Sequence, residues 1–156
     1  MSNNKSIKVI SSNKKASFLY LLSDKYEAGI SLLGSEVKAI RENSVNIKES
    51  YIRVKNLELF VIGMHIGEYS HRGYSSHDPL RERKLLLHKK EIRKIDRSIK
   101  ESGKTIIPTL LYFKNGKIKL EFSIAKGKKI WDKRIAKKDK DIKRDIDRVI
   151  KVKNEK

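Results

Sequence analysis

The sequence contains no cysteine, only two prolines and a single tryptophan. Without cysteine the chain can hold neither a disulfide framework nor a thiolate metal site, which fits a reducing compartment. No apolar run approaches the roughly 18 residues that a membrane-spanning helix needs. The first residues, MSNNKSIKVI, lack the apolar stretch of a secretory signal. We therefore expect a cytoplasmic protein.

Acidic residues are scarce relative to basic ones. The 156 residues include 38 Lys or Arg against 19 Asp or Glu, a formal charge of +19, so a polyanion is the expected partner. Nucleic acid is the commonest polyanion, and an anionic membrane surface is the alternative. The length suits one domain, and the last 31 residues alone hold 14 basic and 6 acidic side chains. We expect two contact surfaces, a basic folded body and a basic extension.

Catalytic and metal-binding patterns are weak or missing. Gly103-Lys104-Thr105 resembles the end of a phosphate-binding loop, but Ser98 stands where that motif needs a glycine. The four histidines lack the tight spacing of metal ligands: His65, His71, His77 and His88. Neither a G-x-S-x-G motif nor a paired-carboxylate constellation is present. The sequence therefore predicts a binding protein that is not an enzyme and has no cofactor and no metal.

The first half of the chain predicts strands around one short helix. Residues 17–33 carry two apolar runs around a polar break at 23–25, which predicts two strands and a turn. A short helix should follow, with Ser35 as its N-cap. Residues 51–66 read as a second hairpin that turns at Lys55-Asn56.

The second half begins with a polar stretch at 67–82, for which we expect a long mobile loop. A helix should follow, because isoleucines at 92, 95 and 99 form one apolar face, and it should stop near Gly103. Asn115-Gly116 is the pair that a type I′ turn requires, so 105–125 predicts a hairpin.

These elements suggest a mainly β fold. A small closed antiparallel barrel of the oligonucleotide-binding (OB) type, with flanking short helices, would leave no exposed strand edge. A β-sandwich with helices on one side fits the pattern nearly as well.

The last residues form a different kind of segment. From Ile135, apolar residues recur at 142, 146, 149 and 150, which gives a thin helical stripe. An isolated helix of about 16 residues is marginal in water. We expect this tail to be largely unfolded alone and helical when docked on a partner.

Cations and one aromatic ring supply the candidate binding chemistry. Phosphate contacts could come from a set of ten basic residues: Lys14, Lys15, Arg81, Arg83, Lys84, Lys89, Lys90, Lys126, Lys128 and Lys129. Trp131 lies past the last expected strand, among cations. Its ring could stack on a nucleobase or pack on the body.

Four stretches, taken together, resemble the SsrA-binding protein (small protein B) family. They are NKKASFLYLLSDKYEAGISLLGSEVKAIR, RERKLLLHKKEI, GKTIIPTLLYFKNGKIKLEFSIAKGKKIWDKR and the basic tail. The resemblance runs from about residue 13 to the end. It implies a flexible N-terminus (1–12), an OB-like RNA-binding barrel (13–126) and a basic tail (127–156) that is disordered in solution and helical on the ribosome.

The family resemblance also implies a function. Members bind the tRNA-like domain of tmRNA, the RNA that rescues stalled ribosomes by trans-translation. The protein stands in for the missing anticodon arm, and its tail enters the decoding centre and the empty mRNA channel. The implied partners are tmRNA and the 70S ribosome with its 16S rRNA. Alanyl-tRNA synthetase and elongation factor Tu are indirect partners through tmRNA. The protein is expected to be a monomer without membrane contact.

Residue by residue, the resemblance and the cation pattern give two candidate sites. The RNA-binding set is Asn13, Lys14, Lys15, Glu27, Arg83, Lys84, Leu87, His88, Lys126, Gly127, Lys128 and Lys129. The ribosome-contacting set is Trp131, Asp132, Lys133, Arg134, Ile142 and Ile146. Two positions depart from the family pattern: His88 stands where many members have asparagine, and Trp131 where they have tyrosine, phenylalanine or histidine.

Two other functions remain open. The chain could be a ribosomal or ribosome-assembly protein with no role in tmRNA binding. It could also bind a membrane surface through the tail, although the apolar stripe of the tail lacks the Trp, Phe or Leu that such helices favour.

Overall fold

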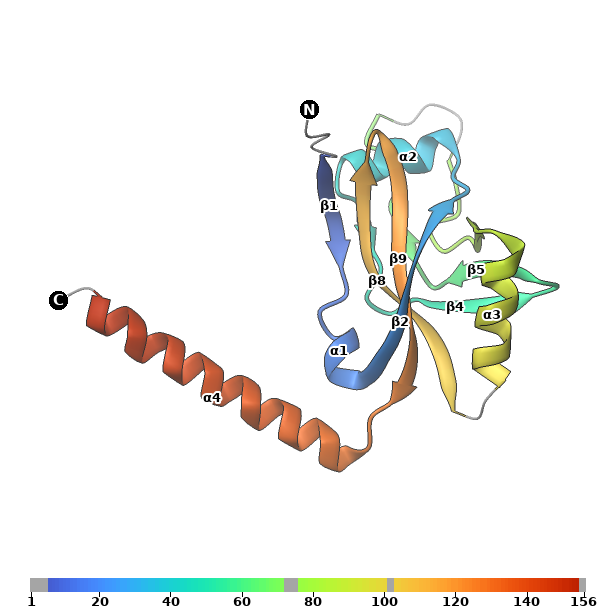
Figure 1. The fold of residues 1–156 in the computed structure, drawn as a ribbon. Coiled ribbons are helices and arrows are strands. Elements are labelled where there is room, and N and C mark those ends of the chain that lie inside the picture. Colours follow the sequence, from blue (N-terminus) through green and yellow to red (C-terminus); the bar gives the residue numbers. More distant parts are fainter. Residues whose placement is uncertain (1–5, 72–75, 101–102, 155–156) are drawn as a thin grey trace, which may run out of the picture.

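The computed structural model describes residues 6–71, 76–100 and 103–154. Its helices are α1 (Ala16–Leu19), α2 (Gly34–Arg41), α3 (Lys89–Lys100) and α4 (Ile130–Asn154). Its strands are β1 (Ile7–Ser12), β2 (Tyr20–Ile30), β3 (Val45–Asn46), β4 (Tyr51–Lys55), β5 (Glu58–Ile62), β6 (His65–Ile66), β7 (Arg83–Leu86), β8 (Lys104–Lys114) and β9 (Lys117–Gly127). The prediction of a mainly β fold with flanking helices is confirmed (Figure 1).

One antiparallel sheet of seven strands forms the body, in the order β1-β8-β4-β5-β7-β2-β9. β8 also pairs with β9, along almost the whole of both strands. The pairing is uneven, because β4 meets β8 only at Ile52 and Ile106, and β2 meets β7 at two residue pairs. β3 and β6 form a small separate sheet.

The core lies inside this curved sheet. Sixteen buried apolar residues form one cluster, to which the long strands contribute Leu111, Leu120 and Phe122. α3 adds Ile92 and Ile95, so the isoleucine stripe predicted from the sequence faces the core.

The β8–β9 hairpin is confirmed. Asn115 and Gly116 both have positive φ, 52° and 74°, as a type I′ turn requires. The β4–β5 hairpin is also present, but its turn residues are Asn56 and Leu57, with φ of 52° and 56°, rather than Lys55-Asn56.

Two predictions for the N-terminal half are wrong. Residues 17–33 do not form a hairpin: α1 leads into the single strand β2, and the polar break is a register shift between Leu22 and Lys25 opposite β9. A bulge places an extra residue in a strand without reversing it. Ser35 is not an N-cap, because α2 begins at Gly34 and Leu33 occupies the N-cap position. The backbone N–H of Leu33 donates to the carboxylate of Glu36, three residues further along, at 2.8 Å.

The polar stretch 67–82 contains no helix or strand in its described parts, as expected, and residues 72–75 lie outside the described residues. Its described ends are tied to the body. The backbone N–H of Gly67 donates to the carbonyl of Ser44 at 2.8 Å, and the His77 ring lies within hydrogen-bond distance of the Ser35 hydroxyl and the Ile66 carbonyl.

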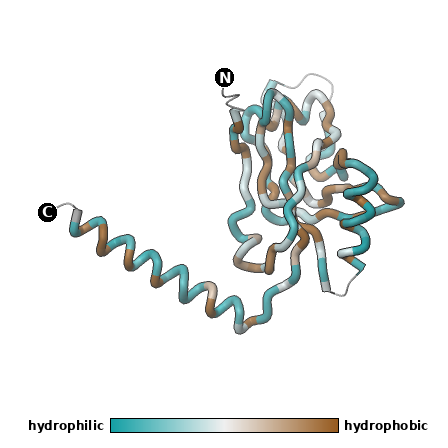
Figure 2. Tube along the Cα trace, in the orientation of Figure 1, coloured by the Kyte–Doolittle hydropathy of each residue, from teal (hydrophilic) through white to brown (hydrophobic). Residues whose placement is uncertain are grey.

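The tail leaves the body as one long helix. α4 spans 25 residues, about 37 Å at 1.5 Å per residue, and it projects away from the sheet (Figure 1). It begins at Ile130, five residues before the stripe recognised in the sequence. Apolar and polar residues alternate along its length (Figure 2). Among the described residues, no helix is both long enough and apolar enough to cross a membrane.

Candidate nucleic-acid interface

Four exposed cations gather at one end of the sheet. Lys14 and Lys15 precede α1, and Lys126 and Lys129 lie at and beyond the end of β9. Distant parts of the sequence meet there because β2 begins where β9 ends: Leu21 pairs with Lys126, and Tyr20 with Gly127. We call these four side chains the basic end. Exposed lysines on a common edge can neutralise several phosphates of one RNA.

Lys128 differs from its neighbours, although the sequence places it in the same basic run. It is half-buried, and its Nζ donates to the carbonyl of Ser17 at 2.9 Å. Its backbone N–H donates to the carbonyl of Leu19 at 3.0 Å. The structure therefore directs Lys128 toward α1.

Asn13 is buried, with 7% of its surface exposed. Its side-chain amide donates to the carbonyl of Pro108 at 3.2 Å, and its backbone N–H donates to the carbonyl of Thr109 at 2.9 Å. Asn13 also lines a hollow of about 250 Å³ between α1 and the loop before β4. In this structure it supports the turn that presents Lys14 and Lys15.

Glu27 lies on β2, seven residues beyond Tyr20. Its carboxylate accepts hydrogen bonds from the Tyr112 hydroxyl and from Lys114 Nζ, the latter at 3.0 Å. The hydrogen bond from Tyr112 lowers the pKa of Glu27, and Lys114 acts in the same direction. Burial and the bond to Glu27 raise the pKa of Tyr112. The carboxylate is therefore ionised at neutral pH. Both of its oxygens are bound by β8, because Lys114 Nζ lies 3.0 Å from each, but 37% of the side chain stays exposed.

Arg83 is the clearest error among the predicted RNA contacts. Its side chain is fully buried: Nε donates to the Glu36 carboxylate at 2.8 Å and Nη1 to the Met64 carbonyl at 2.6 Å. Arg81 holds the other edge of the same carboxylate at 2.8 Å. With its donors used and no exposed surface, Arg83 cannot contact an RNA phosphate. It ties the end of the 67–82 segment to α2.

Lys84, Leu87 and His88 lie where β7 passes into α3. Lys84 is exposed and paired with Glu58 at 2.6 Å. His88 is exposed and directly precedes α3, and its backbone N–H donates to Glu91 at 3.2 Å. Leu87 is half-buried against the core.

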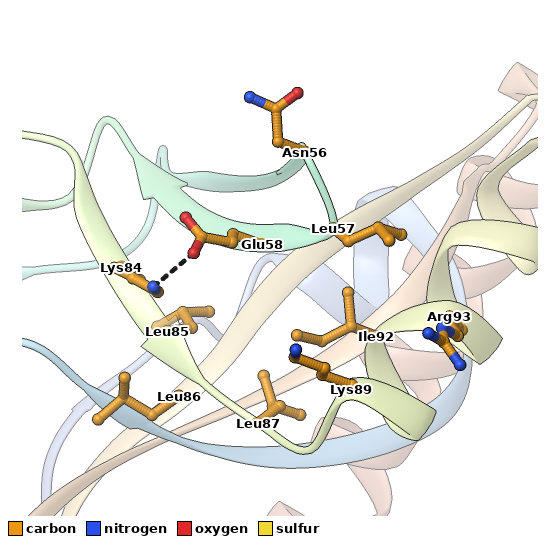
Figure 3. A pocket seen from close by; sticks show the side chains of 10 residues that line it. All are labelled: Asn56, Leu57, Glu58, Lys84, Leu85, Leu86, Leu87, Lys89, Ile92 and Arg93. Atoms are coloured by element: carbon orange, nitrogen blue, oxygen red, sulfur yellow. Dashed lines mark hydrogen bonds and ion pairs between the residues drawn. The ribbon is translucent and has the colours of Figure 1, made fainter.

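A hollow of about 450 Å³ opens beside these residues (Figure 3). It is lined by Asn56, Leu57, Glu58, Lys84, Leu85, Leu86, Leu87, Lys89, Ile92 and Arg93. Leucines line its floor and wall, and Lys84, Lys89 and Arg93 stand around them (Figure 3). Such a mixture suits a nucleotide, whose base is flat and apolar and whose phosphate is anionic.

Sequence reasoning missed Leu57 and Leu86, which are 50% and 54% exposed. Leu86 also lines a second hollow with Gly29 and Phe113. The alternation within β7 was the available signal: if Leu85 points inward, Leu86 must point outward.

The residues predicted to contact the ribosome lie at the start of α4 and along it. Trp131 is 69% exposed, so in this structure it does not pack on the body. Asp132 and Lys133 are half-buried and Arg134 is exposed. Ile142 and Ile146 are 48% and 54% exposed, which is high for large apolar side chains.

No group of three or more histidine, aspartate or glutamate side chains within residues 6–71, 76–100 and 103–154 is arranged to hold a metal ion.

Known proteins resemble this chain over most of its length. The family model described as SmpB protein matches residues 10–152. An SsrA-binding protein of Persephonella marina is 50% identical over 145 residues, covering 93% of this chain and 95% of the relative. An SsrA-binding protein of Staphylococcus haemolyticus is 50% identical over 147 residues, covering 94% of each.

A solved structure shares the fold. It is described as "tmRNA-SmpB: a journey to the center of the bacterial ribosome", and it matches with a TM-score of 0.64 and 38% identity over 76% of this chain and 84% of the other. Sequence and structure agree that this chain belongs to the SmpB protein family.

Proposed function

We propose that this protein binds the tRNA-like domain of tmRNA (SsrA RNA) and brings it to stalled ribosomes for trans-translation. Relatives with half of their residues identical are SsrA-binding proteins, and the solved relative is associated with tmRNA and the bacterial ribosome. A net charge of +19 suits an RNA partner. The protein acts as a binding factor without cofactor, not as an enzyme.

The body supplies the RNA-binding surface. The basic end contacts phosphates, and the partly exposed carboxylate of Glu27 accepts a further hydrogen bond from a base amino group or a 2′-hydroxyl. Leu87, His88 and Lys84 contact the RNA beside the hollow of Figure 3. The strand order supports a small closed OB-like barrel, because the series β8-β4-β5-β7-β2-β9 is completed by pairing of β9 with β8. Two of its strand pairs, β4 with β8 and β2 with β7, are joined over only one or two residue pairs.

The tail supplies the ribosome contact. Trp131 stacks on a base of the decoding centre, Asp132, Lys133 and Arg134 contact the surrounding 16S rRNA, and Ile142 and Ile146 face the wall of the empty mRNA channel. The exposure of Trp131 and of these isoleucines on a helix that projects from the body is the observation that carries this assignment. Free in the cytoplasm, the monomer has a tail that is largely unfolded beyond the first turn after Lys129, and the rest of the helix forms on docking.

Truncation after Lys129 tests this division of labour. The shortened protein should bind the tRNA-like domain with nearly unchanged affinity and lose tagging of stalled ribosomes. Alanyl-tRNA synthetase and elongation factor Tu should act on the bound tmRNA as before. If truncation abolishes RNA binding, the body is not the RNA-binding surface.

Sequencing of the RNA that co-purifies with the protein separates rescue from a structural role. Enrichment of tmRNA supports the proposal. Enrichment of ribosomal RNA alone would indicate a ribosomal or ribosome-assembly protein.

A further inference from the structure

α1 and the segment between β9 and α4 are joined through Lys128. The Nζ of Lys128 donates to the carbonyl of Ser17 at 2.9 Å, and its backbone N–H donates to the carbonyl of Leu19 at 3.0 Å. We call these two hydrogen bonds the α1 clasp. They join residues 111 and 109 positions apart in the sequence, so the fold, not local geometry, brings them together.

α1 offers unusual acceptors because it is a single turn. The carbonyls of a helix's last turn have no partner within the helix. Here the carbonyl of Lys15 accepts from Leu19 and that of Ala16 from Tyr20. The carbonyls of Ser17 and Leu19 are the ones that Lys128 binds. A cation at a helix C-terminus is also favoured by the helix dipole.

α1 is itself fixed to the sheet, which makes it a firm point of attachment. Ala16 is 2% exposed and packs with Ile107 of β8 and Ala125 of β9 in a small buried cluster. Tyr20, directly after α1, pairs with Gly127. The bond from the Lys128 N–H to Leu19 therefore continues the β2–β9 ladder one step beyond the strand.

The clasp lies directly before the tail. Only Lys128 and Lys129 separate the end of β9 from the start of α4. The carbonyl of Lys129 accepts from the backbone N–H of Lys133 at 3.1 Å, so the helix begins immediately after the clasp. Because the connection is so short, the orientation of Lys128 restricts the direction in which the first residues of α4 can run.

We propose that Lys128 is a positioning residue: the α1 clasp fixes the direction in which the tail leaves the body and so holds Trp131 in place. Its ammonium serves this contact rather than an RNA phosphate. The functional part of this inference rests on the proposed role of Trp131 at the decoding centre. The structural part stands on the contacts alone.

Trp131 provides a probe without labelling, because it is the only tryptophan. The experiment compares its fluorescence anisotropy in the full-length protein and in the variant Lys128→Met. Methionine has an unbranched side chain of similar length, removes the ammonium that donates to Ser17 and leaves the backbone hydrogen bond to Leu19 in place. Lys126→Met and Lys129→Met are matched controls, since each loses one charge from an exposed lysine of the same run. Lys128→Arg keeps a cationic donor and is the rescue variant.

The clasp predicts lower anisotropy in Lys128→Met than in both controls, and recovery in Lys128→Arg. Circular dichroism of each variant establishes that the body is folded. Equal anisotropy in Lys128→Met and the controls, with folded bodies, would overturn the inference.

Binding and tagging assays then test the functional part. Lys128→Met should bind the tRNA-like RNA within about twofold of the unmodified protein, because its ammonium serves α1 and not a phosphate, whereas Lys129→Met removes a cation of the basic end and should bind more weakly. The tagging rate of Lys128→Met should be lower by about fivefold, the factor that one lost hydrogen bond produces. A loss of RNA affinity in Lys128→Met without a change in anisotropy would make Lys128 an RNA contact instead. If the wild-type protein fails to bind tmRNA, the proposed function is wrong, and the anisotropy comparison still decides whether the clasp exists.

Discussion

Replacement of Glu36 by glutamine should destabilise the body strongly. The Glu36 carboxylate accepts from Arg83 Nε at 2.8 Å, from Arg81 Nη2 at 2.8 Å and from the Leu33 backbone N–H at 2.8 Å. Both Glu36 and Arg83 have 0% side-chain exposure. Glutamine has the same shape but no charge, so it leaves the buried guanidinium uncompensated. Removing one partner of a buried ion pair lowers the free energy of unfolding by about 3–5 kcal/mol.

The chain contains a matched control in the pair of Glu58 and Lys84. Their charged atoms are 2.6 Å apart, closer than in the buried pair, yet both side chains are 44% exposed. Water screens such a pair, and exposed pairs contribute about 0–1 kcal/mol. Glu58→Gln should therefore change stability little, although the chemical change is the same and the ion pair is shorter. Burial, not distance, decides the difference.

Urea denaturation followed by circular dichroism measures both variants against the unmodified protein. The midpoint should fall much further for Glu36→Gln than for Glu58→Gln, with similar slopes for all three proteins. A loss below about 1 kcal/mol for Glu36→Gln would refute the reasoning, because it would mean that the Arg83 charge is not isolated by burial.

The effect should also depend on pH. Burial alone would raise the pKa of Glu36, but hydrogen bonds from Arg81, the Leu33 N–H and Arg83 outweigh it and hold the pKa below its ordinary value. The carboxylate therefore stabilises the folded state fully above its unfolded pKa, about 4.3. That stabilisation is lost as the pH falls through the lower folded pKa. The stability difference between the protein and Glu36→Gln should shrink as the pH falls below about 4.

Four further predictions follow from the site and the turns. Affinity for the tRNA-like RNA should fall with salt with a log–log slope of about −3 to −4 if the four lysines of the basic end each contact a phosphate; a flat response would remove them from the interface. Trp131→Ala should leave that affinity within about twofold and lower the tagging rate by about tenfold through lost stacking, whereas unchanged tagging would assign the ring no contact on the ribosome. Gly116→Ala should lower stability by about 1 kcal/mol because φ is 74°, while Gly34→Ala, in open space without a positive φ, should be nearly neutral in the same denaturation assay. A peptide of residues 130–156 should show little helix by circular dichroism in water, and a strongly helical spectrum would contradict the proposal that the tail is disordered before it docks.

Elements fixed by local chemistry could be predicted from the sequence. Asn115-Gly116 has few alternatives to a tight turn, and the isoleucines of α3 give a clear helical period. The apolar stripe from Ile135 also has a helical period, and the tail's being helical only when docked stays a prediction. In each case the pattern lies within a few neighbouring residues, so it can be recognised without knowledge of the rest of the fold.

Errors arose where distant residues decide the outcome. The polar residues in the middle of β2 are typical of a turn in the sequence. In the fold they form a shift in the β2–β9 register, which only the neighbouring strand β9 reveals. Arg83 reads as a surface cation until Glu36 is known to be buried opposite it. Residues two apart share a face of a strand. The inward-facing Leu85 therefore indicates that Arg83 also points inward. Lys128 and Lys129 are adjacent lysines that the sequence cannot tell apart. The position of α1 distinguishes them, because only Lys128 donates to the carbonyl of Ser17.

The projecting α4 also affects how the particle behaves in solution. A compact chain of this length would have a radius of gyration of about 15 Å, which is less than half the length of α4. Drag on a protruding rod or a loose segment exceeds drag on a sphere of equal mass. Gel filtration should therefore assign a single copy an apparent mass well above that of a 156-residue globule, and light scattering, which weighs the particle directly, should return the mass of one chain.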